Sequence, residues 1–185
     1  MIKYFILLVS IVFLCPARAL DSIPIVGKSC MLTKSLRVDD LVDKSGKIFV
    51  GKFLYAEANR IKGLDIRTMH FQLLDPIKGV KATNNEIVIN EWARMKSPFL
   101  GQVKKNQKYV FFFYEESARG LSSLVGFDQG FARVNESNQL EFSNRVDLKT
   151  RRIARPSFST LSKEVPAIEV HTLKDLKDLC QDSSI

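Results

Sequence analysis

The chain has 185 residues, of which 45% are hydrophobic and 26% charged, and its 28 basic and 20 acidic side chains give a formal net charge of +8. This length suits a single domain with one hydrophobic core. No internal repeat or low-complexity tract interrupts the sequence. These properties exclude a repeat array and a chain of several domains.

The N-terminus has the pattern of a secretory signal peptide. Lys3 supplies a positive charge, residues 4–14 form an apolar run, and Ala17-Arg18-Ala19 ends the segment with small side chains at its first and third positions. The run is shorter than the roughly 20 residues that a membrane-spanning helix needs. We therefore expect cleavage after Ala19, an exported protein that is periplasmic or secreted, and no transmembrane segment in the mature chain.

A lipoprotein signal is the alternative interpretation of this segment. It would make Cys15 the lipidated residue, but such signals place a small side chain before the cysteine, and Leu14 is not small. Cleavage after Ala19 leaves one predicted domain over residues 20–185. Loss of Lys3 and Arg18 leaves 26 basic against 20 acidic residues, so the mature formal charge is +6.

The mature chain keeps two cysteines, Cys30 and Cys180, one near each end. In an oxidising compartment they would form a disulfide, which the chain-entropy model values at roughly 4 to 5 kcal/mol for so long a loop. Two buried, unpaired thiols are the alternative. No second Cys or His lies at the short spacing of a zinc site, so we expect no metal and no cofactor.

The first predicted elements are a short helix and a long hairpin. Apolar residues within 36–42 follow a helical spacing, and residues 47–58 form a strand in which Gly51 makes a bulge or bend. Residues 66–74 alternate in polarity and supply the second strand. We expect Asp75-Pro76 to end it.

Two further strands are predicted in the middle of the chain. Residues 86–92 form a strand whose Val88 side faces the core. The run Tyr109–Tyr114 is aromatic or β-branched throughout, which predicts a central strand covered on both faces.

The chain closes with a second hairpin and a helix. Residues 131–134 and 140–142 are its strands, and the helix begins near Thr172, an N-cap with Asp175 three residues later as an approximate capping box. These elements predict a mainly β fold. We expect a small antiparallel OB-like barrel (the oligonucleotide/oligosaccharide-binding class) of five to six strands, with a short N-terminal helix and a C-terminal helix.

Several short motifs follow one another in the order of a known family. They are Ile48-Phe49-Val50-Gly51-Lys52, Thr68 with Phe71, Lys78-Gly79, Phe99-Leu100-Gly101, Lys108-Tyr109-Val110-Phe111-Phe112 and the run from Gly120 to Phe131. In this order they resemble a family of exported bacterial proteins of unassigned activity, whose barrel looks like the netrin-like module of tissue inhibitors of metalloproteinases. The resemblance spans about residues 36–134.

The resemblance implies a fold and an extracytoplasmic location. The inhibitors chelate the zinc of their target through a cysteine at the mature N-terminus, whereas this chain would begin at Leu20, with Cys30 further in. The inhibitory device is therefore absent. No functional residue carries over from the inhibitors.

The glycine-punctuated loop from Gly120 to Phe131 is the first candidate binding surface. It concentrates short polar side chains between apolar ones, and the candidate partner-binding residues are Ser122, Ser123, Asp128 and Gln129. The alternative is that the loop folds across the barrel mouth and satisfies its own backbone through Ser and Asp side chains.

A basic cluster is the second candidate surface. Arg151, Arg152 and Arg155, with Lys149, could contact an anionic membrane surface or an acidic partner. A solvated loop is the alternative. Export excludes nucleic acid as a partner.

Catalytic patterns are weak. His70 and His171 are the only histidines, and no serine or cysteine stands in a nucleophile motif. Glu115-Glu116 are adjacent on an extended chain, so their carboxylates point apart. We expect no catalytic residues and no enzymatic activity.

The sequence thus predicts an exported, non-enzymatic interaction module of unknown ligand, with an envelope or extracellular protein as its partner. The alternative function is an inhibitor or regulator of an extracytoplasmic protease, by analogy of fold alone.

Overall fold

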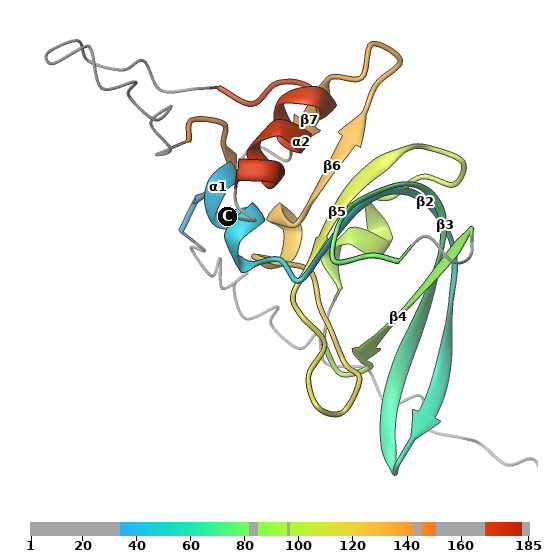
Figure 1. Cartoon of the computed structure of the whole chain (residues 1–185). Helices are drawn as coiled ribbons and strands as arrows, with labels where there is room; N and C mark the ends of the chain where they lie inside the picture. The colour runs from blue at the N-terminus through green and yellow to red at the C-terminus, as the bar shows by residue number, and fades with distance from the viewer. Residues whose placement is uncertain (1–33, 82–84, 96, 143–145, 151–168, 183–185) are drawn as a thin grey trace, which may run out of the picture. The chain divides into compact units, whose positions relative to one another are not determined.

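The computed structural model describes residues 34–81, 85–95, 97–142, 146–150 and 169–182. The fold is mainly β, as predicted, with a six-stranded antiparallel sheet in the order β4-β3-β2-β5-β6-β7 (Figure 1). Its strands are β2 (Lys47–Ile61), β3 (Leu64–Lys78), β4 (Glu86–Trp92), β5 (Tyr109–Phe113), β6 (Phe131–Val134) and β7 (Leu140–Phe142).

Two helices and a small second sheet complete the described chain. The helices are α1 (Val38–Lys44) and α2 (Leu173–Asp182), near the two ends as predicted, and they contact each other. Strand β1 (Leu36–Arg37) pairs in parallel with β8 (Val146–Asp147), a pairing that the sequence did not indicate. Two short 3-10 helices, η1 (Pro98–Gly101) and η2 (Phe127–Gln129), lie in the connections.

The β2–β3 hairpin bends at Gly51, where the predicted irregularity is confirmed as a shift of register between Val50 and Gly51. A Cβ at Gly51 would lie 2.8 Å from the carbonyl oxygen of Gln72, so the close approach of the two strands requires glycine. Up to Gly51, β2 pairs with both β3 and β5. Beyond Gly51, β2 pairs with β3 alone.

The prediction that Asp75-Pro76 ends the second strand is wrong, because β3 continues to Lys78. Pro76 pairs with Phe49 at a place where the register shifts. Strand β4 pairs with β3 only as far as Gln72, so Pro76 lies on a stretch with one paired neighbour. Proline is tolerated at such edges because no second strand needs its missing N–H.

Strand β5 is covered on both faces, as its apolar run predicted. Val110 and Phe112 pack into a largely aliphatic core with residues of β2, β6, α1 and α2. Tyr109, Phe111 and Phe113 pack on the opposite face into an aromatic core, where the ring centroids of Phe71 and Phe111 are 4.8 Å apart. Phe99 of η1 belongs to this aromatic core.

The buried face of β4 is the opposite of the one predicted. Ile89 and Glu91 are buried on the side of the aromatic core, whereas Val88 is 45% exposed. The carboxylate of Glu91 is accommodated because Arg67 donates to its Oε2 at 3.0 Å. The sequence had placed Glu91 on the face away from the core, and its ion pair with Arg67 is what permits its burial.

The described sheet is open, with β4 and β7 as its edges, so it is not a closed barrel. The connection after β5 bridges part of the gap. Ser122 N donates to the carbonyl oxygen of Asn90 in β4 at 2.8 Å, and Ser123 O accepts from Tyr114 N at 3.0 Å. This connection contacts β4 through one hydrogen bond, and it meets the end of β5 at an isolated antiparallel bridge between Phe113 and Leu124.

Helix α2 begins with the predicted capping box. Thr172 Oγ1 accepts from Asp175 N at 3.2 Å, and Asp175 Oδ2 accepts from Thr172 N at 2.9 Å. Cys180 is buried in this helix. Cys30, its predicted partner, lies outside the described residues, as does the predicted signal peptide, so the disulfide and the cleavage stay predictions. Among the helices described, none has the length and apolar character needed to cross a bilayer.

Candidate functional site

The loop from Gly120 to Phe131 holds two of its four candidate side chains inside the molecule. Ser122 is buried and donates through Oγ to the carbonyl oxygen of Tyr114 at 2.6 Å. Gln129 is 1% exposed, and its Oε1 accepts from Leu36 N at 2.7 Å. Both side chains satisfy backbone groups of the fold, so a partner would have to displace those contacts to reach them. Ser123 and Asp128 are partly buried.

The same loop presents an aromatic side chain instead. Phe127 is 48% exposed and adopts a left-handed backbone with φ of 60°, directly after Gly126 at φ of 64°. Bulky residues rarely adopt this conformation. The positive φ of Gly126 is a conformation that residues with a Cβ rarely adopt, so the turn that carries Phe127 favours glycine at that position.

The predicted basic cluster cannot be placed. Arg151, Arg152 and Arg155 lie outside the described residues. Lys149 is exposed and forms an isolated bridge with Glu169, and its carbonyl oxygen accepts from Arg37 Nε at 3.2 Å. The cluster therefore stays a prediction.

The strand pairing brings together a group of side chains that the sequence did not connect. Tyr55 of β2, His70 of β3 and Val88 of β4 are neighbours across three strands. The rings of Tyr55 and His70 stack with centroids 4.2 Å apart. Because Met69 and Phe71 face the aromatic core, His70 and its neighbours face the other way.

We call this surface the outer face and define it by Leu54, Tyr55, His70, Val88 and Trp92. Seven large hydrophobic residues are exposed in the described chain, and five of them lie on β2, β3 and β4. The outer face includes four of these five, namely Leu54, Tyr55, Val88 and Trp92. Leu74 is the fifth. A concentration of this kind is unusual on a surface that contacts only water.

His70 lies between two carboxylates on this face. Its Nδ1 is 2.6 Å from Glu86 Oε1, and its Nε2 is 3.7 Å from Glu57 Oε1. Nε2 is buried without a hydrogen-bond partner among the described atoms. Both glutamates are about half exposed, so they give the outer face a negative rim on a chain that is basic as a whole.

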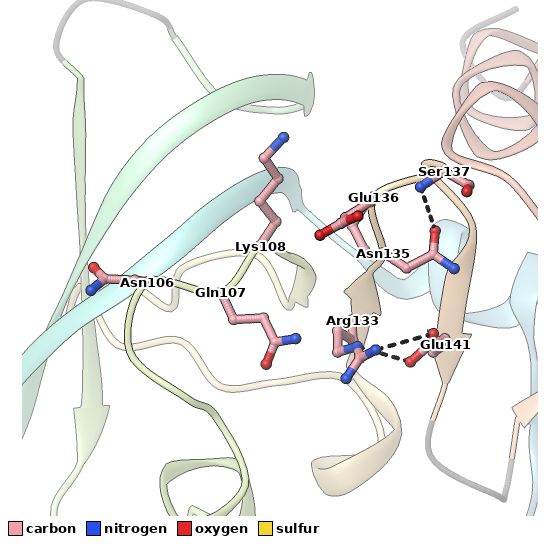
Figure 2. Close-up of a pocket in the computed structure, with 9 residues that line it drawn as sticks. Asn106, Gln107, Lys108, Arg133, Asn135, Glu136, Ser137 and Glu141 are labelled. Atoms are coloured by element: carbon pink, nitrogen blue, oxygen red, sulfur yellow. Dashed lines mark hydrogen bonds and ion pairs between the residues drawn. The ribbon is translucent and has the colours of Figure 1, made fainter.

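A charged cleft of about 520 Å³ lies elsewhere, between the turn at residues 106–108 and the hairpin of β6 and β7 (Figure 2). On the hairpin side of the cleft, Arg133 of β6 forms an ion pair with Glu141 of β7, with 2.8 Å between Nε and Oε2. Among the described residues, the ammonium of Lys108 has no hydrogen-bond or ion-pair partner.

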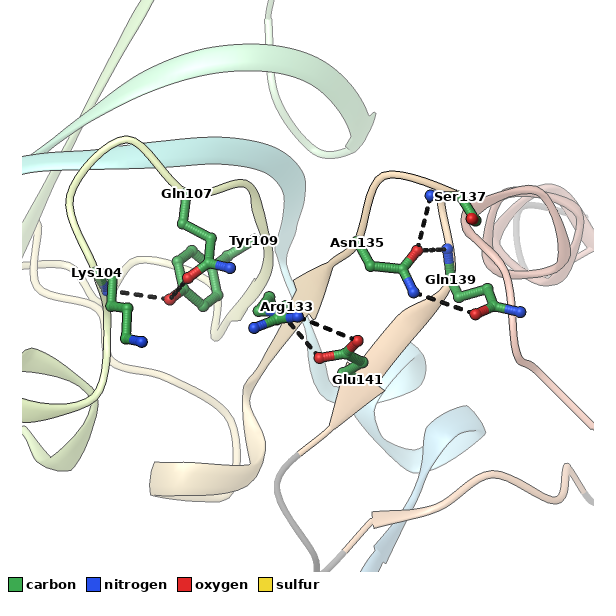
Figure 3. A network of polar contacts seen from close by, with 8 residues as sticks. All are labelled: Lys104, Gln107, Tyr109, Arg133, Asn135, Ser137, Gln139 and Glu141. Atoms are coloured by element: carbon green, nitrogen blue, oxygen red, sulfur yellow. Dashed lines mark hydrogen bonds and ion pairs between the residues drawn. The ribbon is translucent and has the colours of Figure 1, made fainter.

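The side chains around the cleft mostly satisfy one another (Figure 3). Asn135 Oδ1 accepts from Ser137 N at 3.0 Å and from Gln139 N at 2.9 Å, which shapes the hairpin turn. The hydroxyl of Tyr109 donates to Gln107 Oε1 at 3.1 Å. This network shapes the cleft, and Asn106, Lys108 and Glu136 also line it, with side chains that form no hydrogen bond or ion pair to other described residues.

The other candidate groups lie apart. His171 Nε2 is 2.9 Å from Glu169 Oε2 at an exposed site, and Glu116 forms an ion pair with Lys47. Glu115 is exposed. Within the described ranges, no three His, Cys, Asp or Glu side chains gather as a metal ion would require.

No protein-family model matches this chain, and no curated protein matches its sequence. Sequence reasoning missed the outer face, although one signal was present: Thr68, His70 and Gln72 alternate with Met69, Phe71 and Leu73. That alternation separates two faces, but only the register of β2 and β4 shows what surrounds His70.

Proposed function

We propose that this chain is an exported, non-enzymatic interaction module that binds a partner protein through the outer face of an OB-like sheet. The observation that carries the proposal is the concentration of exposed Leu54 and Tyr55 on β2 with exposed Val88 and Trp92 on β4, the two strands that flank β3. Burial of such side chains by a partner gains roughly 25 cal/mol for each Å² removed from water.

Two other surfaces support binding less well. The cleft beside Arg133 is lined by polar and charged side chains with Val134 as the single apolar residue of its lining, and Arg133 is already paired with Glu141. The loop from Gly120 to Phe131 uses Ser122 and Gln129 to hold the fold, which leaves Phe127 as its exposed anchor. The outer face instead combines several exposed apolar side chains with a charged rim, as protein interfaces do.

The test compares capture of envelope proteins by the mature chain and by surface variants. Leu54→Ser with Tyr55→Ser changes the outer face, and Phe127→Ser changes the loop. Tyr114→Ser is the matched control, because Tyr114 is similarly exposed but lies at the end of β5. Mass spectrometry identifies the captured proteins, and circular dichroism checks that each variant is folded.

We expect the outer-face variant to lose the partner that the wild type and the Tyr114→Ser variant retain. If the outer-face variant captures the same proteins as the wild type, the proposal is wrong. Loss of capture with Phe127→Ser alone would move the site to the loop. Inhibition of one enzyme in a panel of extracytoplasmic proteases would identify the partner as a protease.

A further inference from the structure

The outward edge of β4 has backbone groups that pair with no other group among the described residues. Leu73 N donates to Asn85 O and Ala93 N donates to Asp65 O, so residues 85, 87, 89, 91 and 93 are those that direct their amides toward β3. The residues between them direct their N–H and C=O groups away from the sheet. Within the part of the chain that the structure describes, nothing pairs with the outward backbone groups of Glu86 and Val88.

The rest of that edge is already occupied. Asn90 O accepts from Ser122 N at 2.8 Å, and Trp92 O accepts from Met95 N at 3.0 Å. The opposite edge of the sheet is also covered, because Leu140 N in β7 donates to His171 O. The open stretch thus lies at the start of β4, which Figure 1 shows beside β3.

The side chains beside the open stretch have a definite chemistry. A hollow of about 540 Å³ is lined by Leu54, Gln72, Asn85 and Glu86. Glu86 uses Oε1 for His70, and its Oε2 has no partner among the described atoms. The hollow offers an apolar side chain next to a carboxylate and two amides, which matches the aliphatic stem and cationic head of Lys or Arg.

We propose that the edge of β4 at Glu86 and Val88 binds an extended cationic segment of a partner protein as an additional strand. The inference rests on the proposed function and names the partner's chemistry. The added strand exchanges backbone hydrogen bonds with Glu86 and Val88. It places a Lys or Arg side chain against Glu86 and, two residues along, a β-branched or aromatic side chain against Val88.

Charge favours this occupant over other segments. Glu86 and Glu57 lie on either side of His70, so two carboxylates stand on the outer face near the open edge, and Lys52 of β2 shares that face through its pairing with Gln72. Glu86 lies on the edge strand itself, so an added strand meets its carboxylate before the ammonium of Lys52, which lies two strands further in. A second copy of this chain would bring Glu86 and its acidic neighbour along with its own edge. A cationic strand at this edge instead places its positive side chain beside the carboxylate of Glu86.

The probe is a synthetic peptide, acetyl-Thr-Arg-Thr-Val-Thr-Val-Thr-amide, whose Arg and Val side chains share one face. Two matched peptides replace Arg by Glu or methylate the backbone nitrogens that would face β4. Binding is followed by the amide chemical shifts of the mature protein. We expect shifts at Glu86 and Val88, about two- to fivefold tighter binding of the Arg peptide than of the Glu peptide, and no binding of the methylated peptide.

Two protein variants separate backbone pairing from side-chain contact. Val88→Pro removes the outward N–H at an edge position where proline is tolerated, and Val88→Thr keeps that N–H and a β-branched side chain. We expect Val88→Pro to abolish peptide binding and Val88→Thr to retain it. Glu86→Gln should remove the preference for Arg over Glu, and Glu136→Gln, on the hairpin far from β4, should keep it.

Several results would overturn the inference. They are equal binding of the methylated peptide, shifts confined to residues 120–130, or no binding of the Arg peptide at millimolar concentration. If the wild type sediments as a dimer and the Val88→Pro variant as a monomer, the edge of β4 binds a second copy of this chain. If Leu54→Ser with Tyr55→Ser abolishes capture of the partner while Val88→Pro leaves it intact, the proposed function stands and strand addition fails.

Discussion

Glu91 shows how one residue can depart from the pattern of its strand. It occupies a core position of β4, where Arg67 and Ser97 contact its carboxylate at 3.0 Å and 3.4 Å. Burial is the largest influence on its pKa and raises it above the ordinary value of 4.5, although the hydrogen bond from Ser97 and the charge of Arg67 act against the rise. A buried carboxylate of this kind is costly to ionise.

The raised pKa predicts a pH dependence of stability. Because the unfolded chain ionises Glu91 near 4.5 and the folded chain only at higher pH, the folded state binds more protons in the interval between. The free energy of unfolding should therefore fall as pH rises through that interval, by about 1.4 kcal/mol for each unit by which the pKa is raised.

Urea unfolding at about pH 4 and about pH 7 measures this effect. In Glu91→Gln the Glu91 contribution should be absent, so the wild type loses more stability than this variant between the two pH values. Glu141→Gln, at an exposed carboxylate paired with Arg133, is the control and should follow the wild type. An identical pH dependence in wild type and Glu91→Gln would contradict the prediction.

Gln129 carries a second prediction at the residue scale. Its Oε1 accepts from Leu36 N and its Nε2 donates to Lys34 O at 3.3 Å, which ties the start of the described chain to η2. Gln129→Ala should destabilise the protein by about 1–3 kcal/mol, because the buried amide is lost and the partly buried Leu36 N loses its acceptor. Gln102→Ala, at an exposed glutamine, should stay within about 0.5 kcal/mol of the wild type. Equal midpoints in thermal unfolding would refute the structural role of Gln129.

At the scale of elements, the sequence predicted strand ends, bends and apolar faces, because these depend on residues that are close together in the chain. Strands β6 and β7 begin and end where expected, Gly51 marks the bend, and β5 is apolar on both faces because both faces are covered. Long-range pairing has no such local signature. The parallel β1–β8 pair joins two strands of two residues each, and neither segment alternates long enough to be recognised.

The same limit explains why the outer face was missed. Val88 and Ile89 are both β-branched, so the pattern of β4 shows two faces without showing which one is buried. The face that carries Glu91 can be buried because Glu91 pairs with Arg67, and this ion pair joins residues of two different strands. The placement of Tyr55 over His70 likewise depends on a shift of register between Phe53 and Tyr55.

Helix α2 supports a prediction at this scale. Partial burial acts to raise the pKa of Asp175, but the hydrogen bonds from Thr172 and His171 outweigh it and hold the pKa below its ordinary value of 3.8. The ionised side chain therefore adds stability above pH 3.8, which is lost as pH falls through the lowered pKa.

Thr172→Ala should cost about 0.5–2 kcal/mol of stability, because the N-cap side chain no longer accepts from Asp175 N. Thermal unfolding at neutral pH measures the loss. Thr172→Ser keeps the hydroxyl and serves as the control. A Thr172→Ala variant as stable as the Ser variant would show that the cap contributes nothing.

At the scale of the whole molecule, the predicted processing and disulfide can be tested together. The mature chain should begin at Leu20, and a bridge between Cys30 and Cys180 makes it lighter by two hydrogen atoms than its reduced form. Intact-mass measurement of exported protein, before and after reduction, checks both features. A mass that retains residues 1–19, or a lipid on Cys15, would refute cleavage after Ala19, and an unchanged mass on reduction would refute the disulfide.

The position of Trp92 has a spectroscopic consequence. It is the only tryptophan in the chain, and its side chain is 44% exposed on the outer face. Because indole emission moves to shorter wavelength when the ring leaves water, a partner that covers this face shifts the fluorescence of the unmodified protein. Unfolding changes the emission less, since the ring already contacts solvent in the native state. The chain thus contains an intrinsic optical reporter of occupancy at the surface proposed for binding.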